Sequence, residues 1–196
     1  MQALTSNLTA PLPASIFVVV HIPPWHPSRL AEVLIPFSPL PVSEAKANQK
    51  VERGHIYVAR PDYHLLTENS TMHLWRGPRE NRHRPAINAL FRSAAVNYKE
   101  RAIGVVLSGS LDDGTTGLWW IKKFGGVTIV QEPSQATFPD MPKNALEHVE
   151  IDYVASAPAI GPLLSELVEG APEVELERLE PCGRDEELRK WKSRES

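Results

Sequence analysis

The chain has 196 residues, of which 42% are hydrophobic and 23% charged, and its formal net charge is −3. This length suits one domain with a hydrophobic core large enough to fold without disulfide bonds or a structural metal. No basic run with interleaved aromatic residues points to a nucleic acid. No apolar run reaches the roughly 18 residues of a membrane span, and residues 1–15 lack the features of a signal peptide. The single cysteine, Cys182, excludes an intramolecular disulfide. We expect a cytoplasmic protein with no membrane insertion.

The first half of the chain alternates apolar runs with turn residues. Ile16–Val20 is a β-branched run of strand length that leads directly into His21 and a proline-rich turn. Pro27–Leu34 is predicted to be a helix, because proline suits the first helical position. Two further strands are predicted at His55–Ala59 and Met72–Trp75. We expect these two to pair with each other through the connection PDYHLLTENST.

The second half carries the clearest helical periodicity. Ile87–Tyr98 places its apolar residues at three- and four-residue steps, which is one face of a helix. The remaining predicted elements are, in order, a strand, a helix, a strand and a helix at Ala102–Leu107, Thr115–Phe124, Gly126–Val130 and Pro158–Val168.

The order of these elements predicts the fold class. Alternating strands and helices indicate an α/β protein with a doubly wound, mostly parallel sheet and helices on both faces. Right-handed crossovers then bring the carboxyl ends of the strands, and any site, to one edge. Residues 1–168 are expected to form one domain. Residues 169–196 are dense in both charges and are expected to be a tail.

The segment VVLSGSLDDGTTGL, residues 105–118, places two carboxylates at the end of a predicted strand. Asp112 or Asp113 therefore lies on the same sheet edge as His21, where a carboxylate can orient a histidine base. The backbone N–H groups near Ser110 lie close to a helix amino terminus, which stabilises developing negative charge. The alternative is that the two aspartates merely cap the following helix.

Other candidate groups carry less information. Residues 76–95 hold His83 and four arginines, among them Arg84, ahead of a helix. They form either a solvated loop or an anion-binding rim. His21 and His26 follow no zinc signature, so no metal site is expected. No G-x-G-x-x-G or P-loop follows any strand, which disfavours a nucleotide-binding domain, and no cofactor is expected.

Several motifs together resemble the catalytic domain of CheB, the chemotaxis protein-glutamate methylesterase, over about residues 1–168. They are HIPP at residues 21–24, RGPREN with HRPAINALFRSAA, the loop GSLDDGTTGL, and GGVTIVQEPSQATFPDMPKNAL. The resemblance implies a Ser-His-Asp triad that hydrolyses glutamate methyl esters on methyl-accepting chemotaxis receptors and deamidates some receptor glutamines. It implies that His21 is the base, Asp113 the orienting carboxylate, and the Ser110 N–H half of an oxyanion hole. We expect Arg84 and its neighbours to bind the acidic receptor helix.

The resemblance also implies that a part is missing. The family's nucleophilic serine follows a first strand, in a G-A-S-x-G-G turn farther upstream of His21 than this sequence reaches. Ser6 and Ser15 lie in no such turn, and MQAL looks like the interior of the helix after it. We therefore expect the first strand and the nucleophile to be absent. The family's receiver domain is absent too, so a receiver would be a separate partner protein.

Two functional hypotheses follow. The first is a methylesterase that is inactive as this chain stands. The second is a non-catalytic relic that binds receptors or signalling partners without turnover.

Overall fold

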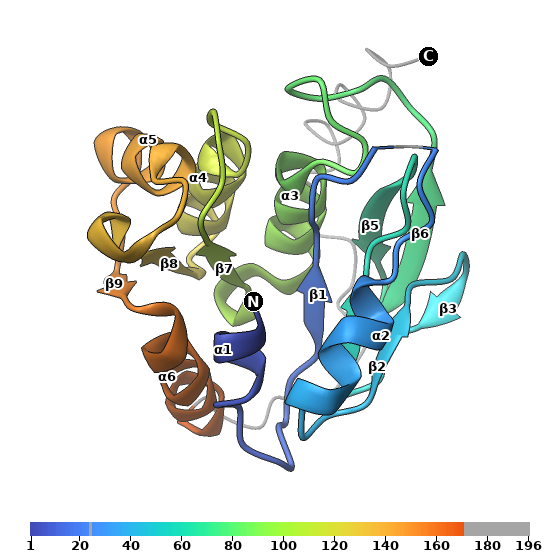
Figure 1. The fold of residues 1–196 in the computed structure, drawn as a ribbon, viewed down its shortest axis with the longest axis horizontal. Coiled ribbons are helices and arrows are strands. Elements are labelled where there is room, and N and C mark those ends of the chain that lie inside the picture. Colours follow the sequence, from blue (N-terminus) through green and yellow to red (C-terminus); the bar gives the residue numbers. More distant parts are fainter. Residues whose placement is uncertain (24, 171–196) are drawn as a thin grey trace.

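The computed structural model describes residues 1–23 and 25–170. Two three-stranded parallel sheets form the centre of the molecule (Figure 1). In spatial order the first consists of β1 (Ile16–Val18), β4 (Ile56–Val58) and β2 (Val42–Glu44). The second consists of β7 (Ile103–Val106), β8 (Val127–Gln131) and β9 (Tyr153–Ala155).

A third, antiparallel sheet corrects one expectation. In spatial order it contains β3 (Gln49–Lys50), β6 (Thr71–Trp75) and β5 (His64–Glu68). The predicted pairing of Met72–Trp75 with His55–Ala59 is therefore wrong. Strand β6 pairs instead with β5, which lies within the predicted connection. The two strands are joined by Asn69 and Ser70, which both take positive φ values, 48° and 56°. That is the geometry of a two-residue hairpin turn whose twist matches the flanking strands.

Helices cover both faces of the parallel sheets, as predicted. The side chains of α1 (Gln2–Thr5), α2 (Leu30–Leu34) and α6 (Ala157–Glu169) pack in one hydrophobic cluster with β1, β4, β7 and β8. On the other face lie α3 (Ile87–Tyr98), α4 (Thr115–Lys123) and α5 (Asp140–His148). Short 3-10 turns occupy Ile35–Phe37, Lys99–Arg101 and Pro133–Gln135.

Most predicted elements lie where the sequence placed them. The Ile87–Tyr98 helix has the predicted bounds, whereas the helix expected from Pro27 begins only at Leu30. The helix expected from Pro158 is α6, and Ser156 caps it by accepting a hydrogen bond from the Ala159 N–H. Strands β2, β3, β5 and β9 and helix α5 were not predicted. Of the expected tail, residues 171–196 lie outside the described residues.

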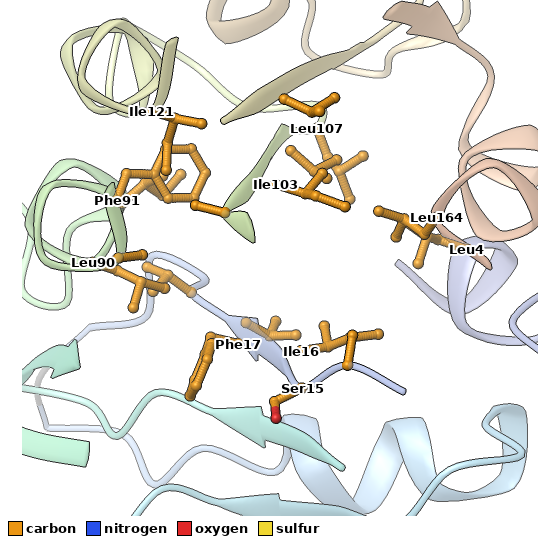
Figure 2. A pocket seen from close by; sticks show the side chains of 18 of the residues that line it. Leu4, Ser15, Ile16, Phe17, Leu90, Phe91, Ile103, Leu107, Ile121 and Leu164 are labelled. Carbon is orange, nitrogen blue, oxygen red and sulfur yellow. The ribbon is translucent and has the colours of Figure 1, made fainter. Parts of the chain in front are cut away.

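The two parallel sheets do not join. Strands β1 and β7 each lie at the end of their own sheet, and a cavity of about 1260 Å³ lies between them. We call it the inter-sheet cavity. Figure 1 shows β1 and β7 facing each other across it. Residues of both β1 and β7 line it (Figure 2). None of the helices within the described ranges is long and apolar enough to cross a membrane.

Candidate functional site

His21 and Asp113 meet at the carboxyl edge of the parallel strands. His21 follows β1 and Asp113 follows β7, and the Nε2 atom of His21 lies 2.6 Å from Oδ2 of Asp113. The two residues are 92 positions apart in the chain. The Asp113 side chain is 1% exposed and the His21 side chain 21%. The pair is therefore anchored on its carboxylate side and accessible on its imidazole side.

Asp113 also holds the start of α3. Its Oδ2 atom accepts a hydrogen bond from the Ile87 N–H at 2.7 Å, and Oδ1 accepts one from the Asn88 N–H at 3.1 Å. Burial alone would raise the pKa of Asp113. The hydrogen bonds from His21 and from these two backbone groups outweigh burial and lower the pKa below its ordinary value. Asp113 is therefore held as a carboxylate.

The expectation that both aspartates merely cap the following helix is wrong. Helix α4 begins at Thr115, after its N-cap residue Gly114, and neither aspartate side chain accepts a hydrogen bond from its first turn. Its first N–H groups donate instead to Asn88, whose Oδ1 lies 3.0 Å from the Gly114 nitrogen and 2.7 Å from the Gly117 nitrogen. The start of α3 is thus capped by Asp113, which precedes α4, and the start of α4 is capped by Asn88 of α3. Asp112 is exposed, and its side chain has no hydrogen bond or ion pair within the described residues.

The loop that carries Asp113 is fixed at both ends. Gly114 has a φ of 100°, and a Cβ atom there would lie 2.8 Å from a methyl carbon of Val106, so the turn requires glycine. At the other end, the Asn144 side chain donates to the Leu111 carbonyl at 2.7 Å. The aspartate is thus presented by a rigid support rather than by a loose loop.

Ser110 lies in this loop and lines the same cavity as His21. The N–H of its neighbour Gly109 donates to the Phe138 carbonyl at 2.9 Å. No acceptor is bound to the Ser110 N–H among the residues that the structure describes. The Ser110 N–H is therefore unpaired within the described residues, in a loop that lines the cavity beside which His21 lies.

His83, which the sequence analysis placed with the four arginines of the candidate rim, packs against His21. Its ring stacks on His21 with a centroid distance of 3.7 Å and an interplanar angle of 7°. Backbone hydrogen bonds between His83 and Glu80 hold its segment, and Arg92 of α3 binds the Glu80 carboxylate at 2.8 Å. His83 is therefore a positioning residue that fixes the plane of the His21 ring. Its only sequence signal was its place just before a predicted helix.

The titration of His83 tests this stacking. Burial and the charge of His21 lower the pKa of His83, and the charge of Asp113 partly offsets them. His21→Phe keeps a flat ring over His83 but removes the charge, so the pKa of His83 should rise and stay below its ordinary value. His21→Ala also exposes the His83 ring to water and should raise the pKa of His83 further. NMR titration of the His83 ring protons measures both, and an unchanged pKa in both variants would contradict the stacking.

Arg84 lies on the same loop but is already engaged. Its guanidinium donates to one carboxylate oxygen of Asp62 and to the Gly77 carbonyl, and its side chain is 16% exposed. The hydrogen bond from Arg84 lowers the pKa of Asp62. These contacts give Arg84 a structural task that sequence reasoning did not foresee. By contrast Arg79 and Arg82 are exposed, and Arg82 lines a second, smaller hollow with Asp112.

No nucleophile contacts His21 within the described part of the chain. Ser15 donates to the Glu52 carbonyl at 2.8 Å, and Ser6 is exposed at the end of α1. His26 is exposed as well, and the described residues contain no group of three side chains that could hold a metal ion. Within the described residues, the site therefore has an imidazole bound to a buried carboxylate and no hydroxyl bound to that imidazole.

Comparisons with known proteins point to one family. A family model described as CheB methylesterase matches residues 1–164. A putative protein-glutamate methylesterase/protein-glutamine glutaminase of Leptospira interrogans is 34% identical over 168 residues, which is 85% of this chain and 87% of the relative. The Thermotoga maritima enzyme of that name is also 34% identical, but the match spans only half of it. The crystal structure of the Thermotoga maritima CheB methylesterase catalytic domain superposes with a TM-score of 0.81 at 35% identity, covering 85% of this chain and 90% of that one.

Proposed function

Because the chain belongs to the CheB methylesterase family, we propose that residues 1–168 act in the hydrolysis of glutamate methyl esters on chemoreceptors. The contact between His21 and Asp113 is the single observation that carries this proposal. A buried carboxylate that orients an accessible imidazole is the arrangement that activates a nucleophile.

In this proposal each ring nitrogen of His21 has its own task. Because the Asp113 carboxylate only accepts hydrogen bonds, the Nε2 atom carries a proton and donates a hydrogen bond to Asp113. The Nδ1 atom, which has no partner within the described residues, is then free to accept a proton from an attacking hydroxyl. The imidazolium that results would be stabilised by Asp113, whose low pKa keeps it negative.

The chemistry then follows the usual course of acyl transfer. The hydroxyl oxygen attacks the ester carbonyl, the Ser110 N–H stabilises the oxyanion, and His21 returns its proton to the departing methoxide, which leaves as methanol. Water then hydrolyses the acyl intermediate by the same route. A receptor glutamine in the same position would lose ammonia instead, which is the second activity in the relatives' name.

We expect this chain to release no methanol from a methylated receptor, because none of its described residues offers a hydroxyl group to His21. The test measures methanol release and receptor binding together. Turnover at the rate of a complete family member would show that a serine already present is the nucleophile. Binding without turnover would favour the alternative, a non-catalytic protein that holds receptors or signalling partners, among them a separate receiver protein.

The arginines of residues 76–95 give a prediction about substrate binding. Arg82→Glu should weaken binding of an acidic receptor helix more at low salt than at high salt, because exposed charges are screened over a Debye length of about 10 Å at 0.1 M. If Arg84 also contacts substrate, Arg84→Gln should show the same salt dependence. If Arg84 acts only through Asp62, Arg84→Gln should lower the melting temperature and weaken peptide binding equally at both salt levels. Fluorescence anisotropy with a labelled peptide separates the outcomes.

A further inference from the structure

Both ends of the loop that carries His83 are bound by one buried histidine. The loop, residues 76–86, runs from the end of β6 to the start of α3 (Figure 1). His64 of β5 is fully buried, and its Nε2 atom lies 2.8 Å from the Pro78 carbonyl oxygen. The Ala86 N–H donates to the Nδ1 atom of the same ring at 3.2 Å. The segment between Pro78 and Ala86 is therefore closed across one imidazole.

The two partners fix which nitrogen of His64 carries the proton. A carbonyl oxygen only accepts hydrogen bonds, so Nε2 donates to Pro78. A backbone N–H only donates, so Nδ1 accepts from Ala86 and carries no proton. The bond at Nε2 thus keeps Nδ1 as an acceptor. A half-turn of the ring would put carbon atoms in both places, so the two bonds also fix its orientation.

The Ala86 end of the loop adjoins the backbone that Asp113 holds. Ala86 is the N-cap residue of α3, and its own side chain forms no cap. Its N–H donates to His64, and the next two N–H groups of the chain donate to Asp113. A shift of Ala86 would therefore move the groups that bind Asp113, the carboxylate partner of His21.

The same end of the loop carries His83. His83 lies three residues before Ala86 in the sequence and stacks on His21 with a centroid distance of 3.7 Å. Arg84, the next residue, is held from its other side by the Asp62 carboxylate. The place of the His83 ring therefore depends on how the short stretch up to Ala86 is held.

We propose that His64 is a positioning residue for the ester hydrolysis described above. Through the Ala86 N–H it sets the start of α3, which Asp113 caps. It thereby also holds His83 in its stack on His21. Because His64 is fully buried, it acts through these groups and not by contact with substrate. Its part in hydrolysis rests on the proposed function, whereas the geometry that it sets does not depend on turnover.

Three substitutions in the full chain separate the two bonds of His64 from its volume. His64→Phe keeps a ring beside Trp75 but loses both bonds. His64→Asn places an amide oxygen near the position of Nδ1 and keeps the acceptor for Ala86. His64→Gln is closer to histidine in volume, but it places an amide nitrogen near the position of Nε2 and keeps only the donor to Pro78. The matched control is His55→Phe, because His55 also stacks on an aromatic ring and forms a side-chain hydrogen bond, at the start of β4.

NMR measures the outcome. In the unmodified chain, NOEs should connect the ring protons of His21 and His83. His64→Phe and His64→Gln should lose these NOEs. In both variants the amides of Ile87 and Asn88 should exchange about tenfold faster, since loss of one buried hydrogen bond is worth roughly that factor. His64→Asn should keep the NOEs and the exchange rates of the unmodified chain.

The proposal fails on any of three results. In the first, His64→Phe and His64→Gln lower the melting temperature but leave the NOEs and the exchange rates intact, so His64 only supports the core. In the second, glutamine restores the site better than asparagine, so volume matters and the Ala86 bond does not. In the third, His55→Phe causes the same losses, so loss of any such histidine loosens the site. If His64→Phe does not fold, the comparison of asparagine with glutamine decides. None of these readouts involves turnover or receptor binding, so they fail or succeed separately from the proposed function.

Discussion

Extension of the chain at its amino terminus with an apolar strand and a G-A-S-x-G-G turn is expected to raise methyl-ester hydrolysis by about 10⁴-fold or more, since loss of a nucleophile costs that much or more in serine hydrolases. The strand would fill the inter-sheet cavity, and the turn at its end would bring a hydroxyl to the Nδ1 atom of His21. The same extension should raise the free energy of unfolding by about 3–6 kcal/mol, because it buries apolar side chains and pairs two strand edges.

The matched control carries alanine in place of the added serine. It should gain the same stability as the active extension and hydrolyse no faster than the original 196-residue chain. Methanol release from a methylated receptor and urea unfolding measure the two effects separately. If the original chain unfolds with the same midpoint and demethylates at the same rate as the extended one, neither the cavity nor the missing hydroxyl limits this protein.

Loss of the Asp113 carboxylate is expected to have the second largest effect. In the extended protein, Asp113→Ala should lower kcat by about 10³–10⁴-fold, because His21 loses the group that sets its tautomer and stabilises its charge. It should also lower the free energy of unfolding by about 2–4 kcal/mol, since two N–H groups of α3 lose their charged acceptor. Asp112→Ala is the control, and its exposed side chain should cost less than about 0.5 kcal/mol.

The pH dependence follows from the lowered pKa of Asp113. A carboxyl with a lower pKa in the folded state contributes stability above its unfolded value of about 3.9. That contribution is lost as pH falls through the folded value. The stability difference between the wild type and Asp113→Asn should therefore be complete between pH 5 and 7 and narrow below about pH 4. A difference that is constant down to pH 2 would show that the carboxylate charge stabilises nothing.

The sequence by itself determined several of the local elements and the sheet edge at which His21 meets an aspartate. The periodicity of Ile87–Tyr98 fixed α3 to its bounds, because an apolar stripe repeats at every turn of a helix. The β-branched runs before His21 and Asp113 identified strands of a parallel sheet, whose carboxyl ends share an edge. That geometry placed His21 near Asp112 or Asp113, and the family resemblance selected Asp113, which lies 92 positions from His21 in the chain.

Only the tertiary structure decided how the surrounding groups are used. It assigned Asp113 to the amino terminus of α3 rather than of α4, stacked His83 on His21, and engaged Arg84 with Asp62. It also left β1 and β7 as two facing edges with a cavity between them. These outcomes depend on contacts between segments far apart in the chain. A hydrogen-bond donor or an aromatic ring has many possible partners in sequence, and packing selects one of them.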